Sequence, residues 1–102
     1  MKLQEALDQY LLQCAADGRS IHTRAQYQRH VRLFAEWLHD VGASDEIAAV
    51  DHKTVARFFV SPAAKTTADG RLKRAGTVNA IRATLSGFFR FHHDAAIFTW
   101  PR

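Results

Sequence analysis

Apolar side chains along this chain recur at helical spacing in four stretches, and no stretch alternates in the way a β-strand would. The first stretch is expected to be a helix over residues 3–16, because its apolar positions are three or four apart and so share one helical face. Asp17-Gly18 follows, and glycine is favoured just past the end of a helix. The predicted buried face consists of Leu3, Ala6, Leu7, Tyr10, Leu11 and Cys14.

A second helix is expected over residues 21–41. Ser20 precedes it as a good N-cap, and Gly42 stands where the helix should end. One face is apolar and is predicted to be buried, with His30 and Trp37 beside it. That face consists of Tyr27, Val31, Phe34, Leu38 and Val41, and the opposite face consists of Ala25, Gln28, Arg29, Arg32 and Glu36.

A third, shorter helix is expected over residues 52–60. Asp51 is its predicted N-cap, and Val50 and Val55 occupy the two positions of a hydrophobic staple. Pro62 follows the segment and blocks continuation of the helix. The side chains expected to point inward are Val55, Phe58 and Phe59.

The next residues, 61–76, read SPAAKTTADGRLKRAG and show no strong periodicity. We expect a long basic loop here, and a connection of this length without structure of its own is uncommon and usually functional or mobile. A fourth helix is expected over residues 77–94, so the whole pattern predicts an all-α protein with four helices. The apolar stripe of the fourth helix consists of Val78, Ile81, Leu85, Phe88, Phe89 and His92.

The opposite face of the fourth helix carries small side chains. Such a face allows another helix to pack closely, and the spacing favours this interpretation. It also allows a helix backbone to approach a nucleic-acid groove, with Asn79, Arg82 and Arg90 at the edges of the contact. The positions on this face are Gly76, Ala80, Ala83, Gly87 and Arg90.

Length and composition fit one soluble globular domain: 102 residues, 47% hydrophobic and 24% charged. No apolar run approaches the roughly 18 residues that span a bilayer, and Glu5 and Asp8 are out of place in a signal peptide. Cys14 is the single cysteine, which excludes an intrachain disulfide. A reducing, cytoplasmic location is therefore expected, with no membrane partner.

The net charge of +4 is unevenly distributed. Residues 61–76 hold four cations against Asp69, a net of +3, and basic side chains also gather at the start of the second helix. Clustered positive charge is typical of a protein that binds a polyanion, although charge alone fits a solvated basic surface equally well. The four cations of the loop are Lys65, Arg71, Lys73 and Arg74.

Catalytic and metal-binding patterns are not found in the sequence. The six histidines form no HxxxH or HxH pair, and the adjacent His92 and His93 would point about 100° apart on a helix. Neither a GxSxG nucleophile motif nor a GxxxxGK[ST] phosphate loop occurs. We therefore expect no metal, no cofactor and no catalysis by this chain itself.

Two predicted helix starts combine a hydroxyl with cationic side chains, which suits phosphate binding. Ser20-Ile21-His22-Thr23-Arg24 opens the second helix, and Lys73-Arg74-Ala75-Gly76-Thr77 opens the fourth. Helix capping alone would be a sufficient reason for Ser20 and Thr77. The recurrence of the same chemistry at two helices favours a functional interpretation.

In these segments the chain resembles the N-terminal core-binding domain of tyrosine recombinases and phage integrases. The matching pieces are TRAQYQRHVRLFAEWL at 23–38 and TVNAIRATLSGFFRF at 77–91, with EIAAVDHKTVARFF between them. The resemblance spans about residues 3–101, and its specificity lies in the order and spacing of the pieces. It implies a small orthogonal four-helix bundle of the SAM-like type that forms half of a clamp around double-stranded DNA.

Carried over by position, the resemblance implies DNA-facing roles at both helix starts. Thr23 would hold a phosphate, with Gln26 and Arg29 directed toward the groove. Ala80 and Ala83 are small where relatives place long or polar side chains, which argues against base readout by the fourth helix. The residues predicted to face DNA are His22, Thr23, Arg24, Gln26, Arg29, Lys65, Arg71, Lys73, Arg74, Thr77 and Thr84.

The family's catalytic residues lie in a separate, following domain, and none can be assigned here. We therefore expect residues 1–102 to be a single core-binding domain whose partners are DNA, that catalytic domain and other protomers of the same recombinase. Tyr10 and Tyr27 lie on apolar helix faces and are expected in the core. The alternative function is a protein-interaction domain that uses the apolar segment 95–100 and the small-residue face.

Overall fold

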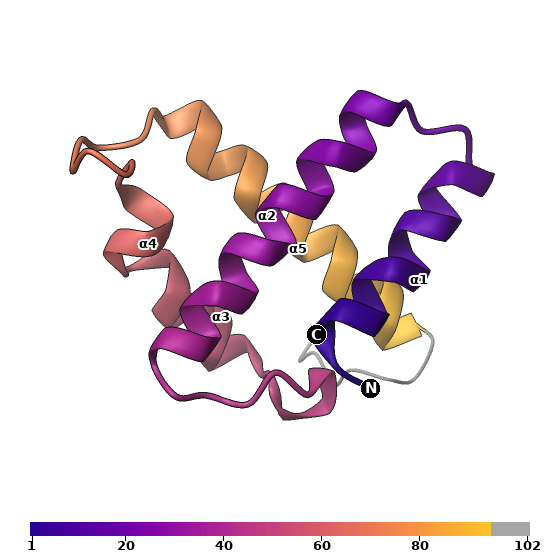
Figure 1. The fold of residues 1–102 in the computed structure, drawn as a ribbon, viewed down its shortest axis with the longest axis horizontal. Coiled ribbons are helices and arrows are strands. Elements are labelled where there is room, and N and C mark those ends of the chain that lie inside the picture. Colours follow the sequence, from indigo (N-terminus) through magenta and orange to yellow (C-terminus); the bar gives the residue numbers. More distant parts are fainter. Residues whose placement is uncertain (95–102) are drawn as a thin grey trace.

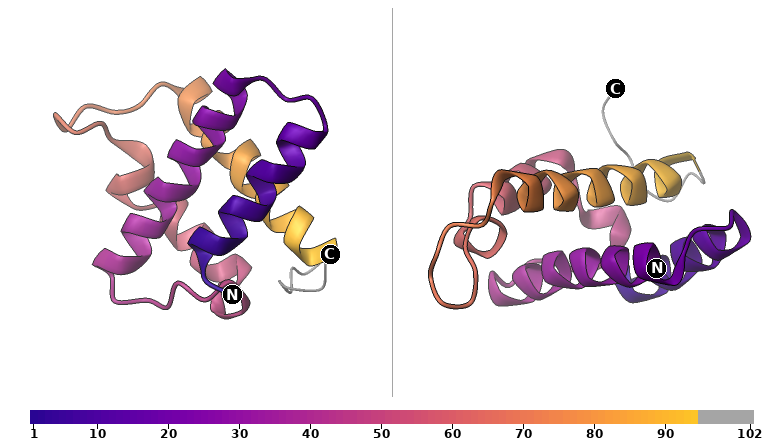
Figure 2. Two further views of the ribbon diagram at one scale, coloured as in Figure 1. Left: turned by 45° about the vertical axis from the view of Figure 1, so that its right-hand side comes forward. Right: turned by 90° about the horizontal axis from the view of Figure 1, so that it is seen from above.

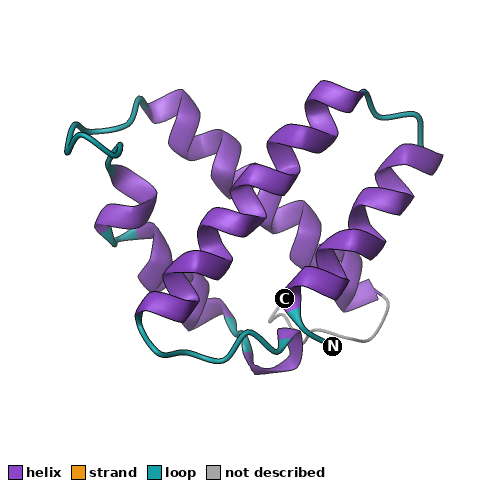
Figure 3. Ribbon diagram, viewed as in Figure 1, coloured by secondary structure: helices purple, strands orange, loops and turns teal. Residues whose placement is uncertain are grey.

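The computed structural model describes residues 1–94, and these form a bundle of helices joined by short connections (Figure 1). Figure 3 shows helices and loops without a strand in this part of the chain, which confirms the all-α prediction. No helix among these residues is long and apolar enough to cross a membrane. The helices are α1 (Leu3–Ala16), α2 (Ile21–Asp40), the 3-10 turn η1 (Ile47–Ala49), α3 (His52–Phe59), α4 (Pro62–Lys65) and α5 (Ala75–Asp94).

The two longest helices, α2 and α5, cross each other near their middles (Figure 1). Seen from above, α1 and α2 lie side by side in one layer and α5 lies in the other (Figure 2). α4 packs against α2, α3 and the beginning of α5. Both α2 and α5 therefore have one face in the core and leave their first turns at the edge of the bundle.

Aromatic rings fill the space between the layers. Phe34 of α2 is fully buried, and its ring centroid lies 5.2 Å from that of Phe58 on α3 and 5.8 Å from that of Phe89 on α5. Both pairs meet edge to face, an arrangement that is favourable beyond the burial of area alone. Trp37 closes the cluster, 5.9 Å from Phe34 and 5.5 Å from Phe58.

The predicted apolar faces of the first, third and fourth helices are confirmed, with Leu3, Phe58 and Phe88 among the fully buried side chains. The face of α2 needs one correction. Val41 is 46% exposed, because α2 ends at Asp40 and the chain turns away through Gly42 at φ +71°. His30 and Trp37, expected beside the stripe, are themselves buried.

Two predicted caps are confirmed. The Ser20 side chain accepts a hydrogen bond from the Thr23 backbone at 3.1 Å, and Asp51 accepts one from the Thr54 backbone at 2.9 Å. The bonds that Asp51 accepts from the Thr54 backbone and from the Thr54 hydroxyl lower the pKa of its carboxyl, since they favour the charged form. Val50 and Val55, on either side of Asp51, are both buried in the core.

The prediction of an unstructured loop over residues 61–76 is wrong. Ser61 and Pro62 begin the short helix α4, and proline suits a first helical position because its missing N–H would have no partner there. The chain then makes a tight turn, with Gly70 at φ +84° and an antiparallel bridge between Thr66 and Leu72. α5 begins at Ala75, two residues before the predicted start at Thr77.

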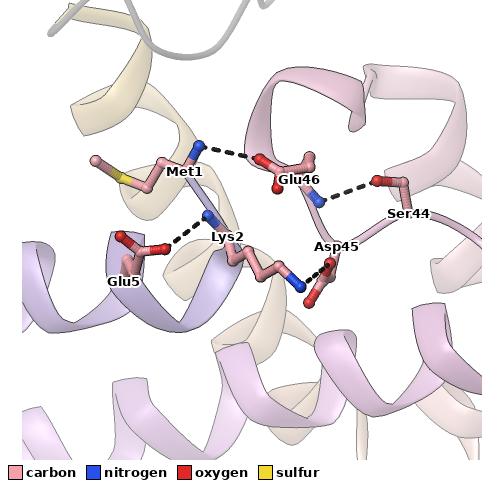
Figure 4. A network of polar contacts seen from close by, with 6 residues as sticks. All are labelled: Met1, Lys2, Glu5, Ser44, Asp45 and Glu46. Atoms are coloured by element: carbon pink, nitrogen blue, oxygen red, sulfur yellow. Dashed lines mark hydrogen bonds and ion pairs between the residues drawn. The ribbon is translucent and has the colours of Figure 1, made fainter.

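The first residues of the chain form hydrogen bonds and an ion pair with the connection between α2 and α3 (Figure 4). Lys2 and Glu46 form an isolated antiparallel bridge, with backbone hydrogen bonds from Leu3 to Asp45 at 2.8 Å and from Ile47 to Met1 at 2.9 Å. The amino group of Met1 also lies 3.0 Å from the Glu46 carboxylate. These contacts seat Ile47 in the core, where it is fully buried.

Candidate nucleic-acid interface

The starts of α2 and α5 lie along the same edge of the molecule, the upper edge in Figure 1. The turn at residues 66–72 lies beside the start of α5 on that edge. The sequence predicted two separate basic helix starts, and the crossing of α2 and α5 places them on one side of the fold. We call this edge, comprising residues 19–29 and 65–77, the basic edge.

Ser20 and Thr23 form two hydrogen bonds with each other at the start of α2. The Ser20 hydroxyl accepts from the Thr23 backbone and donates to the Thr23 hydroxyl at 3.0 Å. Thr23 Oγ1 is therefore an acceptor for Ser20, which leaves its own hydrogen to donate elsewhere. A phosphate oxygen is a suitable acceptor for that hydrogen.

Three of the other four predicted residues of α2 lie on its accessible side. His22, Gln26 and Arg29 are exposed, and they follow one another at helical spacing toward the middle of the helix. Arg24 is half-buried, and its Nε atom is enclosed without a hydrogen-bond partner among the described residues. The structure thus brings a hydroxyl, an amide and two guanidinium groups to the start of α2.

The turn at residues 66–72 is exposed to solvent from Thr67 to Leu72. Its backbone is closed by hydrogen bonds from Thr67 to Arg71 at 2.8 Å and from Gly70 to Thr67 at 3.0 Å. Asp69 accepts from the Thr67 hydroxyl and lies 3.5 Å from Arg71. The Arg71 side chain is still 85% exposed, so this pairing leaves it accessible.

Lys73 and Arg74 differ sharply in their surroundings although they are adjacent. Arg74 is exposed, and its carbonyl accepts from the backbone of Thr77 at 3.0 Å in the first turn of α5. Lys73 is half-buried and donates through Nζ to the Ala63 carbonyl at 3.0 Å. Burial also lowers the pKa of the Lys73 ammonium. Lys65 and Thr77, the remaining predicted residues here, are exposed.

Comparison with protein families matches residues 7–95 to the phage integrase N-terminal SAM-like domain. The chain belongs to this family. Comparison with curated proteins and with solved structures gives no match. The family predicted from residues 23–38 and 77–91 is thereby confirmed, and with it the SAM-like fold of this integrase domain.

Thr84 does not lie on the basic edge of the integrase domain. It is 4% exposed, and its hydroxyl lies 2.8 Å from His30 Nδ1 on α2 and 3.0 Å from the Ala80 carbonyl. The prediction that Thr84 faces a groove is therefore corrected: the side chain joins α5 to α2 inside the bundle. The sequence placed Thr84 by counting turns from Thr77 and did not identify the facing histidine.

The small-residue face of α5 serves partly to let α1 approach. A Cβ atom on Gly87 would lie 3.0 Å from the Tyr10 hydroxyl, so the absence of a side chain makes room for that tyrosine. Ala80 is half-buried, whereas Gly76 and Ala83 are exposed. Helix packing, the interpretation that the spacing favoured, holds at Gly87. Residues 95–100, the other part of the alternative interface, lie outside the described residues.

Sequence reasoning missed the structure that supports the basic edge. Ser61-Pro62 is a helix-start signature and Asp69-Gly70 is a turn signature, and together they could have indicated α4 and the turn. The Ala63 carbonyl, which accepts from Lys73, carries no signal in the sequence. Within residues 1–94, no three histidine, cysteine or acidic side chains gather as metal ligands would.

Proposed function

We propose that this integrase domain binds duplex DNA at the core site of recombination and positions a separate catalytic domain of the same recombinase on it. The observation that carries the proposal is the basic edge, on which two helix starts and the 66–72 turn lie together (Figure 1). Each of these three parts has at least one exposed cationic side chain. Duplex DNA is the polyanion that suits such a surface, because cations displace counterions from its phosphates. On DNA, we expect other protomers of the recombinase beside it.

Each part of the basic edge has a role in the proposed complex. The Thr23 hydroxyl donates to a phosphate oxygen, and Gln26 and Arg29 enter the groove one and two turns later on the same helix. The cations around the start of α5 contact the sugar–phosphate backbone and fix the register of the domain. These cations are Lys65, Arg71 and Arg74.

A salt titration tests the proposal. Duplex DNA should bind the domain at low salt, with about five phosphate contacts giving a slope of log K against log salt of roughly −4 to −5. Arg74→Ala should flatten this slope by about one unit. No binding at low salt, or a slope near zero, would refute DNA binding by this domain.

A matched control separates the basic edge from net charge. Lys53 is exposed on α3, outside the basic edge, so Lys53→Ala removes the same charge without removing a proposed contact. Its slope should match that of the unsubstituted protein. An equal loss from both variants would mean that overall charge, and not the basic edge, governs binding.

Protein interaction through α5 is the competing function. The structure supports it less, because Gly87 is already covered by Tyr10 of the same chain. Sedimentation at several protein concentrations distinguishes the two functions. Association that persists at high salt would support the interaction domain, whereas a monomer that binds DNA would support the recombinase domain.

A further inference from the structure

Lys73 stands between the turn and α5, and it is attached to α4 in two places. Its backbone N–H donates to the Lys65 carbonyl at 2.7 Å, and its Nζ donates to the Ala63 carbonyl at 3.0 Å. Ala63 and Lys65 belong to α4, which packs on α2 and on α5. Lys73 therefore ties the end of the turn that leads into α5 to the body of the domain.

The environment of the Lys73 ammonium is unlike that of a surface phosphate ligand. Its side chain lines a shallow apolar hollow with Leu33 of α2 and with Pro62 and Ala63 of α4. Burial lowers its pKa, and its charge in turn contributes, after burial and Arg29, to lowering the pKa of His30. The ammonium thus lies toward α2 and α4, away from the exposed position of its neighbour Arg74.

The parts that Lys73 holds are those that carry the exposed cations. Arg71 is in the turn, Arg74 is the residue before α5, and Lys65 is the last residue of α4. The turn between them is closed by its own hydrogen bonds and by the Thr66–Leu72 bridge. At its first residue it is joined to α4, because the backbone N–H and the hydroxyl of Thr66 donate to the Pro62 carbonyl at 2.8 and 2.7 Å. Lys73 supplies the attachment to α4 at the other end of the turn, the end that leads into α5.

We propose that Lys73 is a positioning residue for DNA binding, which orders the turn and its arginines and does not itself contact a phosphate. This inference rests on the proposed function. It also reverses what the sequence predicts, since a lysine inside an LKRAG segment at a helix start would ordinarily be counted among the phosphate ligands.

Lys73→Met tests the role, because methionine keeps most of the side-chain volume and removes the charge and the donor. In the full chain, affinity for duplex DNA should fall about threefold to tenfold, the size of one lost hydrogen bond, at every salt concentration. The salt slope should stay unchanged. Arg74→Met is the matched comparison and should flatten the slope by about one unit.

Hydrogen exchange without DNA gives the readout that does not depend on binding. Amide exchange of Thr67 and Lys73, whose N–H groups donate to Arg71 and Lys65, should quicken in Lys73→Met and stay unchanged in Arg74→Met. A slope flattened by one unit, with unchanged exchange, would overturn the proposal and return Lys73 to the phosphate ligands. Amide exchange as slow in Lys73→Met as in the unsubstituted protein, together with unchanged affinity for DNA, would overturn it as well.

The unsubstituted protein provides a second test, should Lys73→Met fail to fold. The ammonium 15N signal of Lys73 should be protected from solvent before DNA is added and should move less than that of Lys65 upon titration. A larger movement of the Lys73 signal would contradict the positioning role. If the unsubstituted protein binds no DNA, the proposed function fails, while protection of the Lys73 ammonium and exchange of the turn still decide whether the attachment exists.

Discussion

His92 Nε2 lies 2.9 Å from the backbone carbonyl oxygen of Ala6, joining the last turn of α5 to the first half of α1. Because a carbonyl only accepts, Nε2 carries a proton. Burial lowers the pKa of the ring and so favours the neutral tautomer, in which Nδ1 carries no proton. Nδ1 is buried without a hydrogen-bond partner among the described residues, and His92 is fully enclosed. A second proton would therefore be added inside the core with no acceptor.

This arrangement predicts a loss of stability in acid. Burial lowers the pKa of His92, and burial together with the charges of Arg29 and Lys73 lowers that of His30. Below about pH 6.5 the unfolded chain takes up protons at these histidines that the folded chain does not. The contribution of the two neutral rings to the free energy of unfolding is therefore fully present above that pH, and it is lost as the pH falls toward their lowered pKa values in the folded protein. The limiting slope is about 1.4 kcal/mol per pH unit for each histidine.

Urea denaturation at a series of pH values measures this slope. His92→Gln keeps a donor for the Ala6 carbonyl and removes the titrating ring, so the slope between about pH 6.5 and 5 should decrease. His22→Gln, at an exposed position of α2, is the matched control. Equal slopes in the unsubstituted protein and in His92→Gln would contradict a neutral buried histidine.

Thr84→Val should destabilise the domain without weakening DNA binding by the folded protein. The substitution removes the hydroxyl that lies 2.8 Å from His30 Nδ1, leaving a buried ring nitrogen unpaired at a cost of about 1–3 kcal/mol. Chemical denaturation measures the loss. Thr77→Val, at an exposed position of the same helix, should cost far less. A loss of DNA affinity in folded Thr84→Val would instead restore the predicted DNA contact.

Gly87→Ala and Tyr10→Phe should be coupled. Alanine is favoured over glycine within a helix by about 1 kcal/mol, but its Cβ would lie 3.0 Å from the Tyr10 hydroxyl, so this gain should be largely cancelled. With Tyr10→Phe the obstacle is gone, and Gly87→Ala should become stabilising. A double-mutant cycle in denaturant should give a coupling of at least about 0.5 kcal/mol. Additive effects would show that α1 and α5 are not in close contact at this point.

Gln26→Ala should alter which DNA sequences the domain prefers. Gln26 is exposed on α2, and a glutamine that pairs with adenine contributes about 1–3 kcal/mol of discrimination. Selection from random duplexes with each protein should show preference lost at one position. Gln9→Ala, exposed on α1, is the control. A uniform loss of affinity, or none, would remove the role in base readout.

The connection before α5 shows where the sequence was insufficient. The stretch from Ser61 to Gly76 has no apolar periodicity because α4 is a single turn, too short for a repeating face to appear. Its structure depends on contacts with other elements: Ala64 is fully buried among them, and Lys73 binds back to Ala63. Thr84 was misplaced for a related reason, since nothing local shows that His30, 54 positions earlier, faces it.

The sequence by itself determined the four amphipathic segments, the caps at Ser20 and Asp51, the all-α class and the family. These are local properties, set by side-chain spacing and by hydrogen bonds within one helical turn. Only the tertiary structure decided which cations are available to a partner. The crossing of α2 and α5 brings two basic helix starts to one edge. Packing against α4 partly buries Lys73 and pairs its ammonium with the Ala63 carbonyl, whereas Arg74 stays exposed. The physical reason is that burial and this hydrogen bond come from another element of the fold, so the sequence alone cannot distinguish the two adjacent cations.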